Sequence, residues 1–202
     1  MDIMTISSIN IYEWLEKRLP EEKYLHSIGA EETARNLAAR FGEDIEKAAL
    51  SALIHDNAKG YSHNELVSIV NENKFSIDEE VKSNSKILHA YVGAYLAEKE
   101  LNITGRDIFN AVMFHTTGRV NMTLLEKIVY LSDKMETKTR DFEYTNKIIN
   151  VLNETNDLDK TILVTIDMTI KSLVDRKLPI NIETINLWNQ LVYAEDKTKI
   201  QT

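Results

Sequence analysis

A histidine and an aspartate stand side by side at positions 55 and 56, in the segment SALIHDNAKG, where an apolar helix is expected to end. Imidazole nitrogens and carboxylate oxygens both bind metal ions and both transfer protons. Lys59 follows at a spacing that puts it on the same face of a continued helix, where its ammonium group could hold a phosphate oxygen. Taken alone, the histidine–aspartate pair is also explained by an ordinary hydrogen bond.

Four further residues of the same kind lie in apolar surroundings. His26 is in KYLHSIGA, His89 in ILHAYVGAYLA, His115 in NAVMFHTTGR and Asp133 in KIVYLSDKME. Individually, each is explained as a core residue that has found a hydrogen-bond partner. Together with His55 and Asp56, they would cost several kcal/mol to bury unless each were paired, and metal ions are an economical common partner.

The composition limits the function classes. The chain has 202 residues, no cysteine and a net charge of −8. Any metal must therefore be held by nitrogen and oxygen, and binding to DNA or RNA is disfavoured because it needs many clustered basic residues. No apolar run is long enough to span a membrane and no secretory signal is present, so we expect a cytoplasmic protein without membrane contact.

The scarcity of glycine and proline, with apolar residues at three- and four-residue spacing, predicts an all-α protein. Gly42 and Gly60 are expected to be helix C-caps, and Pro179 should interrupt the last long helical stretch. No linker or repeat divides the chain, so we expect one helical bundle of about ten helices. The expected helices are about 8–18, 23–41, 44–58, 62–72, 86–100, 105–115, 121–136, 144–154, 157–177 and 182–194.

The order of these residues resembles the HD phosphohydrolase superfamily: a histidine at 26, the His55–Asp56 pair, then Asp133, on successive helices. The segments around His89, FHTTGR at 114–119 and NMTLLEKIVYLSDKME at 121–136 are similar to the YqeK group, bacterial symmetrical bis(5'-nucleosyl)-tetraphosphatases. The similarity runs from about residue 10 to LPINIETINLWNQL, nearly the whole chain. It implies one HD domain over residues 1–202, whose C-terminal helices (about 144–198) pack on a metal-binding core (about 20–136).

The resemblance also implies a dinuclear metal centre. It assigns His26, His55, Asp56 and Asp133 to one ion, and His89, His115 and a bridging Asp56 to a second. Iron is the metal that the family suggests. The ligand types alone suit iron, manganese, zinc, cobalt or nickel and do not choose among them.

The implied reaction is hydrolysis of diadenosine tetraphosphate to two ADP. Two cations about 3.5–4 Å apart would turn a bridging water into hydroxide near neutral pH, which would attack phosphorus. Asp56, Lys59 and Arg119 are the expected catalytic residues. Expected phosphate contacts come from Lys59, Thr116, Thr117, Arg119 and Arg140, the last of which matches a family arginine. Glu126 and Glu136 flank Asp133 but are expected to point elsewhere.

Several alternatives remain open from the sequence. The metal site could serve another nucleotide, as in a nucleotide phosphatase or a phosphodiesterase. A non-catalytic HD module that binds a nucleotide is a further alternative. Arg119 and Arg140 are also explained as solvated surface residues, and His63 is expected at the surface. The exact nucleotide and the oligomeric state stay open, with a homodimer as one alternative.

Overall fold

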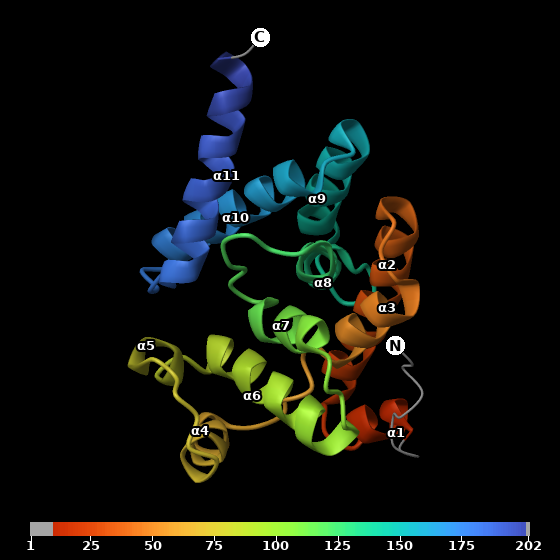
Figure 1. The fold of residues 1–202 in the computed structure, drawn as a ribbon, viewed down its shortest axis with the longest axis vertical. Helices are drawn as coiled ribbons and strands as arrows, with labels where there is room; N and C mark the ends of the chain where they lie inside the picture. Colours follow the sequence, from red (N-terminus) through yellow and green to blue (C-terminus); the bar gives the residue numbers. More distant parts are fainter. Residues whose placement is uncertain (1–9, 201–202) are drawn as a thin grey trace.

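The computed structural model describes residues 10–200, with side chains through residue 195, and within this range all regular structure is helical (Figure 1). The all-α prediction is confirmed. No described helix is long and apolar enough to cross a membrane. The helices are α1 (Ile11–Glu16), α2 (Glu21–Phe41), α3 (Ile45–Ile54), α4 (His63–Glu72), α5 (Glu79–Lys82), α6 (Ser85–Leu101), α7 (Arg106–Phe114), α8 (Leu124–Met135), α9 (Phe142–Thr155), α10 (Leu158–Asp175) and α11 (Ile182–Ile200).

Side-chain caps start most of these helices. Ser62 and Thr123 each form a capping box with the glutamate three residues later, at the starts of α4 and α8. Asp44 and Asp141 accept hydrogen bonds from backbone N–H groups in the first turns of α3 and α9. Such caps satisfy N–H groups that have no partner within the helix, so they fix where each helix begins.

The helix expected over 44–58 ends at Ile54, four residues early, and the prediction that Gly60 caps it is wrong. The side-chain amide of Asn57 donates to the carbonyls of Ile54 and Gly93, at 2.8 and 2.9 Å, and so occupies an acceptor at the helix end. Gly60 does not have the left-handed backbone of a helix cap. Its Cβ would lie 2.2 Å from the Arg18 carbonyl oxygen, so this position needs glycine for close approach. Gly42 does adopt the left-handed cap.

Two further differences concern helix content. The four-residue helix α5 was not expected, because it is too short to show periodicity. The predicted helix at 8–18 is shorter in the structure, and residues 8 and 9 lie outside the described range. The interruption around Pro179 is confirmed, since α10 ends at Asp175 and α11 begins at Ile182.

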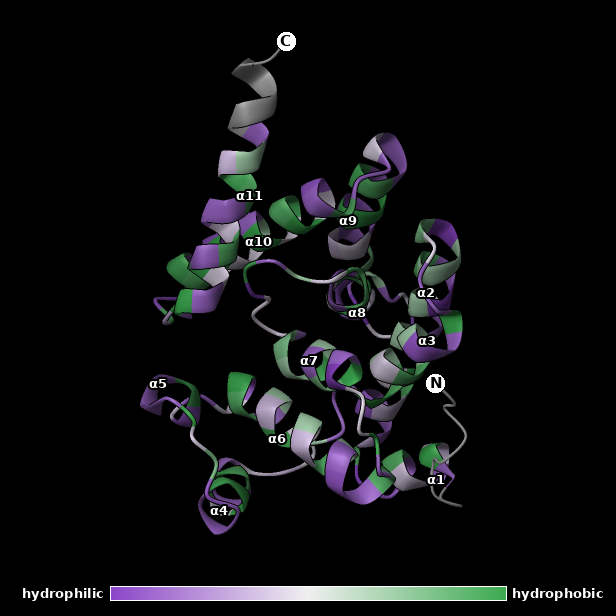
Figure 2. Cartoon of the chain, viewed as in Figure 1, coloured by the Kyte–Doolittle hydropathy of each residue, from purple (hydrophilic) through white to green (hydrophobic). Residues whose placement is uncertain are grey.

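Helix α8 is central to the packing. It contacts α2, α3 and α7 on the side toward the N-terminal half, and α9 and α10 on the other (Figure 1). One hydrophobic core runs through these helices, and a smaller one joins α4, α5 and α6. Most helices carry both hydrophobic and hydrophilic residues, as amphipathic packing requires (Figure 2). This packing brings the ends of α3, α7 and α8 close to α2 and α6.

Candidate metal centre

Five helices deliver the six candidate ligands to one buried place. His26 comes from α2 and His89 from α6, and Asp133 lies near the end of α8. His55 and His115 are the C-cap residues directly after α3 and α7, and Asp56 follows His55 in the sequence. All six side chains are buried. Helix C-termini carry partial negative charge, so the ends of α3 and α7 favour a cation here.

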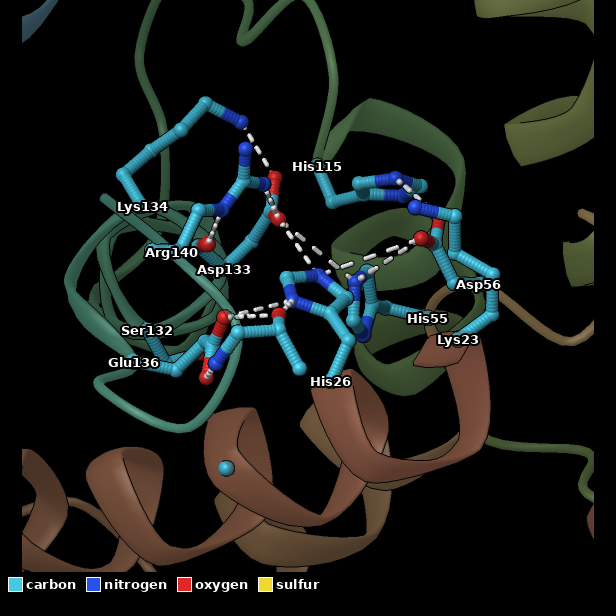
Figure 3. A network of polar contacts seen from close by, with 12 residues as sticks. Lys23, His26, His55, Asp56, His115, Ser132, Asp133, Lys134, Glu136 and Arg140 are labelled. Carbon is cyan, nitrogen blue, oxygen red and sulfur yellow. Dashed lines mark hydrogen bonds and ion pairs between the residues drawn. The ribbon is translucent and has the colours of Figure 1, made fainter. Parts of the chain in front are cut away.

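Asp56 lies between two groups of histidines and turns one oxygen toward each. Its Oδ2 is 3.6 Å from His55 Nε2 and 3.9 Å from His26 Nε2. Its Oδ1 is 2.9 Å from His89 Nε2 and 3.3 Å from His115 Nε2. Figure 3 shows His26, His55, Asp56, His115 and Asp133 converging, with His55 and Asp56 coming from the same end of α3. A carboxylate in this position can bind two ions at once.

Asp133 completes the first group. Its Oδ1 lies 2.9 Å from His26 Nε2 and 3.7 Å from His55 Nε2. Within each cluster of three candidate ligands, the ligand atoms lie within 4.8 Å of one another. Metal–ligand bonds of about 2.0–2.3 Å suit atoms at this separation.

The second ring nitrogen of each imidazole is held by the surrounding chain. Nδ1 of His55 is 2.6 Å from the Ala52 carbonyl, and Nδ1 of His115 is 2.7 Å from the Val112 carbonyl. A carbonyl accepts only an N–H, so Nδ1 of both rings is the donor, and in a neutral ring Nε2 is then the nitrogen whose lone pair is left to bind a metal. His89 Nδ1 lies 3.2 Å from the Ser85 carbonyl. Partners of this kind orient metal-ligating histidines.

His55 supplies the test of whether a metal fits. Its Nε2 is fully buried and has no hydrogen-bond partner among the described residues, although it points at two carboxylates. A buried polar atom without a partner is costly. A cation placed among His55, Asp56 and Asp133 satisfies this lone pair and both acids together, so the residues fit a metal ion.

The pKa shifts of the site residues agree with a role as metal ligands. Burial lowers the pKa of His89, and it lowers the pKa of His115 to about 3, so both rings are neutral ligands at ordinary pH. Burial would raise the pKa of Asp56, but the neighbouring His55, His115 and His89 outweigh it and hold that pKa well below its usual value. The carboxylate is therefore charged, as a metal ligand must be.

His26 differs because it has acidic partners on both ring nitrogens. Burial would lower its pKa, but hydrogen bonds to Asp133 and Glu136 outweigh burial and raise it to about 9. Glu136 was expected to point elsewhere, and that expectation is wrong. Helix α8 ends at Met135, the backbone of Glu136 is extended, and its Oε1 lies 2.9 Å from His26 Nδ1. A carboxylate behind a ligating imidazole is a common feature of metal sites.

The HD domain family matches residues 24–138, the segment that carries all six of these side chains. This chain belongs to the HD-domain family. The fold and the donor set together indicate a divalent metal centre.

Two similar enzymes match nearly the whole chain. A symmetrical bis(5'-nucleosyl)-tetraphosphatase from Halalkalibacterium halodurans is 38% identical over 181 residues, which is 90% of this chain and 95% of that protein. The enzyme of that name from Bacillus subtilis is 35% identical over 178 residues, 88% of this chain and 94% of that protein. The resemblance seen in the sequence is thus confirmed, and the chain is a hydrolase of the HD type.

A solved structure agrees with the fold. It is a crystal structure from Clostridium acetobutylicum, described as a predicted HD superfamily hydrolase involved in NAD metabolism. It superposes with a TM-score of 0.85 at 37% identity, over 91% of this chain and 96% of that one.

Three cations surround the HD-domain ligands. Lys59 Nζ lies 3.1 Å from His89 Nε2 and 3.4 Å from Asp56 Oδ1, and its side chain is 33% exposed. Arg140 and Lys134 both form ion pairs with Asp133 (Figure 3). Lys59 is no longer on a helix, since α3 has ended, but tight turns still bring it beside Asp56. Lys134 and Glu136 are the site residues that the sequence reasoning missed.

The remaining predicted site residues lie around the turn after α7. The Thr116 hydroxyl is 3.0 Å from His115 Nε2, so it borders the metal centre. The buried Thr117 hydroxyl donates to the Gly118 carbonyl. Arg119 is placed differently: its guanidinium is 2.8 Å from the buried carboxylate of Glu126 and lies over the Phe114 ring. Among the described residues, its ion pair and its ring contact are with these two and not with the six candidate ligands.

Proposed function

We propose that this chain hydrolyses diadenosine tetraphosphate symmetrically to two ADP, at a dinuclear metal centre held by His26, His55, Asp56, His89, His115 and Asp133. The division of the Asp56 oxygens between two histidine groups is the observation that carries the proposal. Iron is the metal we place first, because the family resemblance suggests it; manganese, zinc, cobalt and nickel suit the same ligands.

The six residues would hold paired cations there, which when bound would supply a water of lowered pKa and neutralise charge on the phosphoryl group. The protein itself keeps the Asp56 carboxylate charged and the His89 and His115 rings neutral, and the buried position of the ligands excludes bulk water. Lys59 and Arg140 reach the site from partly exposed positions, so they can meet phosphate oxygens there. We assign them to charge stabilisation around the reacting phosphate.

The proposed substrate follows from relatives, because enzymes with that activity are similar to this chain over nearly its full length. Symmetric cleavage also needs the bond between the two central phosphates to lie at the metals. Lys59 and Arg140 lie beside the candidate ligands and would position the polyphosphate chain there.

Product analysis tests the proposal. Metal-reconstituted protein is incubated with diadenosine tetraphosphate, and the nucleotides are separated by chromatography. ADP as the sole product supports it. ATP with AMP would contradict symmetric cleavage, and an inert reconstituted protein would remove the proposed substrate.

A further inference from the structure

A cavity of about 470 Å³ opens beside the half of the metal centre formed by His89 and His115. Its walls come from the start of α6, the turn at residues 116–117, the end of α10 and the segment that leads into α11. These parts lie far apart in the sequence but face one another in the fold (Figure 1). The volume is within the range of small-molecule sites, about 300–1,000 Å³.

Two wall residues touch the metal ligands directly. Thr116 lines the cavity, and its hydroxyl is 3.0 Å from His115 Nε2. Ser85 also lines it, and its carbonyl is the partner of His89 Nδ1. Thr116 therefore borders both the cavity and the ligand side of the His115 ring, so a group attached to a phosphate at this end of the centre would lie next to the cavity.

The walls match a flat ring system with polar edges. Ile87, Leu173, Leu178 and Pro179 supply apolar surface, and the polar residues Glu80, Asn84 and Lys86 also line the cavity. Ligand sites commonly combine apolar walls with a few polar groups that fix orientation. The faces of a nucleobase suit the apolar walls, and its edge and ribose suit the polar groups.

We propose that this cavity binds one nucleoside of the dinucleoside polyphosphate. The inference rests on the proposed function, because the phosphate chain sets where the nucleoside begins. It also gives the C-terminal helices a role in recognition. Leu173 and Leu178 lie beyond residues 24–138, the part that matches the HD domain, whereas the tetraphosphatase relatives match most of the chain. The metal chemistry and the choice of nucleoside then come from different parts of the fold.

Leu173→Trp tests the proposal, because a larger ring at this half-buried wall position fills the cavity. Val174→Trp is the matched control: it adds the same ring to the same helix at a side chain that is 50% exposed and does not line the cavity. Leu178→Trp, at an exposed position after α10, is a second variant should the first fail to fold. Melting temperatures identify folded variants.

Two readouts are taken with metal-reconstituted protein: kinetics with diadenosine tetraphosphate, and calorimetric binding of ADP against inorganic pyrophosphate. Leu173→Trp should raise KM and weaken ADP binding at least about tenfold, or about 1.4 kcal/mol. Pyrophosphate binding should not change, and Val174→Trp should behave as the unaltered protein does. ADP binding that is equal in the two variants overturns the cavity assignment, even if the enzyme is active.

The two failures are distinguishable. If the unaltered protein does not cleave diadenosine tetraphosphate, the proposed function fails. The cavity assignment is then decided by ADP binding alone: weakening by Leu173→Trp supports it, and ADP binding that is absent or insensitive to that change overturns it.

Discussion

Glu136 and His26 are joined by a buried contact of 2.9 Å between Oε1 and Nδ1, from the end of α8 to α2. Glu136 is itself fixed, since it accepts from the Thr139 hydroxyl at 2.6 Å and from the backbone N–H groups of Lys138 and Thr139. The carboxylate therefore holds the imidazole in one orientation, with Nε2 toward Asp133.

Glu136→Gln should weaken metal binding by about 10- to 100-fold, the usual effect of losing a charged partner behind a ligating histidine. The amide keeps the volume but loses the charge and one acceptor. Titration of metal-free protein with Mn²⁺ measures the affinity. Glu143→Gln, at an exposed position on α9, is the control. Equal affinities in the two variants would show that Glu136 does not support the metal.

Gly29→Ala should also weaken metal binding. A Cβ at this position would lie 2.5 Å from Glu136 Oε2, and four hydrogen bonds resist movement of that carboxylate. Alanine in place of a glycine within a helix usually stabilises by roughly 0.5–1 kcal/mol. Here we expect the opposite sign in thermal unfolding, together with lower Mn²⁺ affinity. A stabilised variant with unchanged affinity would contradict this close approach.

The metal-free protein should lose stability as pH rises from about 7 to 9. The pKa of His26 is about 9 in the folded chain, against 6.5 ordinarily. A raised pKa gives stability that is complete below about 6.5 and is lost as pH rises through about 9. Urea unfolding in the presence of a chelator measures this. With metal bound, stability should instead rise with pH, because binding displaces the proton. A metal-free protein whose stability is flat over this window contradicts the assignment.

Lys59→Met should lower kcat/KM while leaving metal content unchanged. The ammonium group of Lys59 lies beside Asp56 and His89, and its side chain is partly exposed. A charged ammonium group does not bind a metal ion, so the metal ligands stay intact without it. Lys171→Met, at an exposed position of α10, provides the control. Elemental analysis and steady-state kinetics are measured on the same samples. Loss of metal from Lys59→Met alone would mean that the lysine supports the ligands and not the substrate.

The fold was largely predictable because helical spacing and capping residues are local signals. The predicted end of a helix was wrong where a contact between residues distant in sequence determines it. The side chain of Asn57 ends α3 by bonding to Ile54 and to Gly93 on α6, and Gly60 is required by the approach of Arg18. Neither contact can be read from a local pattern.

The candidate ligands were predictable because their residue types and order resemble a known family. Their supporting residues were not. Glu136 was missed because the helix was expected to continue through residue 136, which would point its side chain away from His26. In the structure α8 ends at Met135, and the extended backbone of Glu136 directs its side chain to His26. Arg119 stays a predicted phosphate contact, and its ion pair with Glu126 could not be read from the spacing in sequence.

In the proposed centre, the Asp56 carboxylate joins two metal ions. Anomalous X-ray diffraction from crystals of metal-reconstituted protein tests it most directly. We expect two peaks about 3.5–4 Å apart, as in other two-metal sites. One should lie at His26, His55 and Asp133, the other at His89 and His115, with Asp56 between them. A single peak, or peaks away from Asp56, would contradict the account.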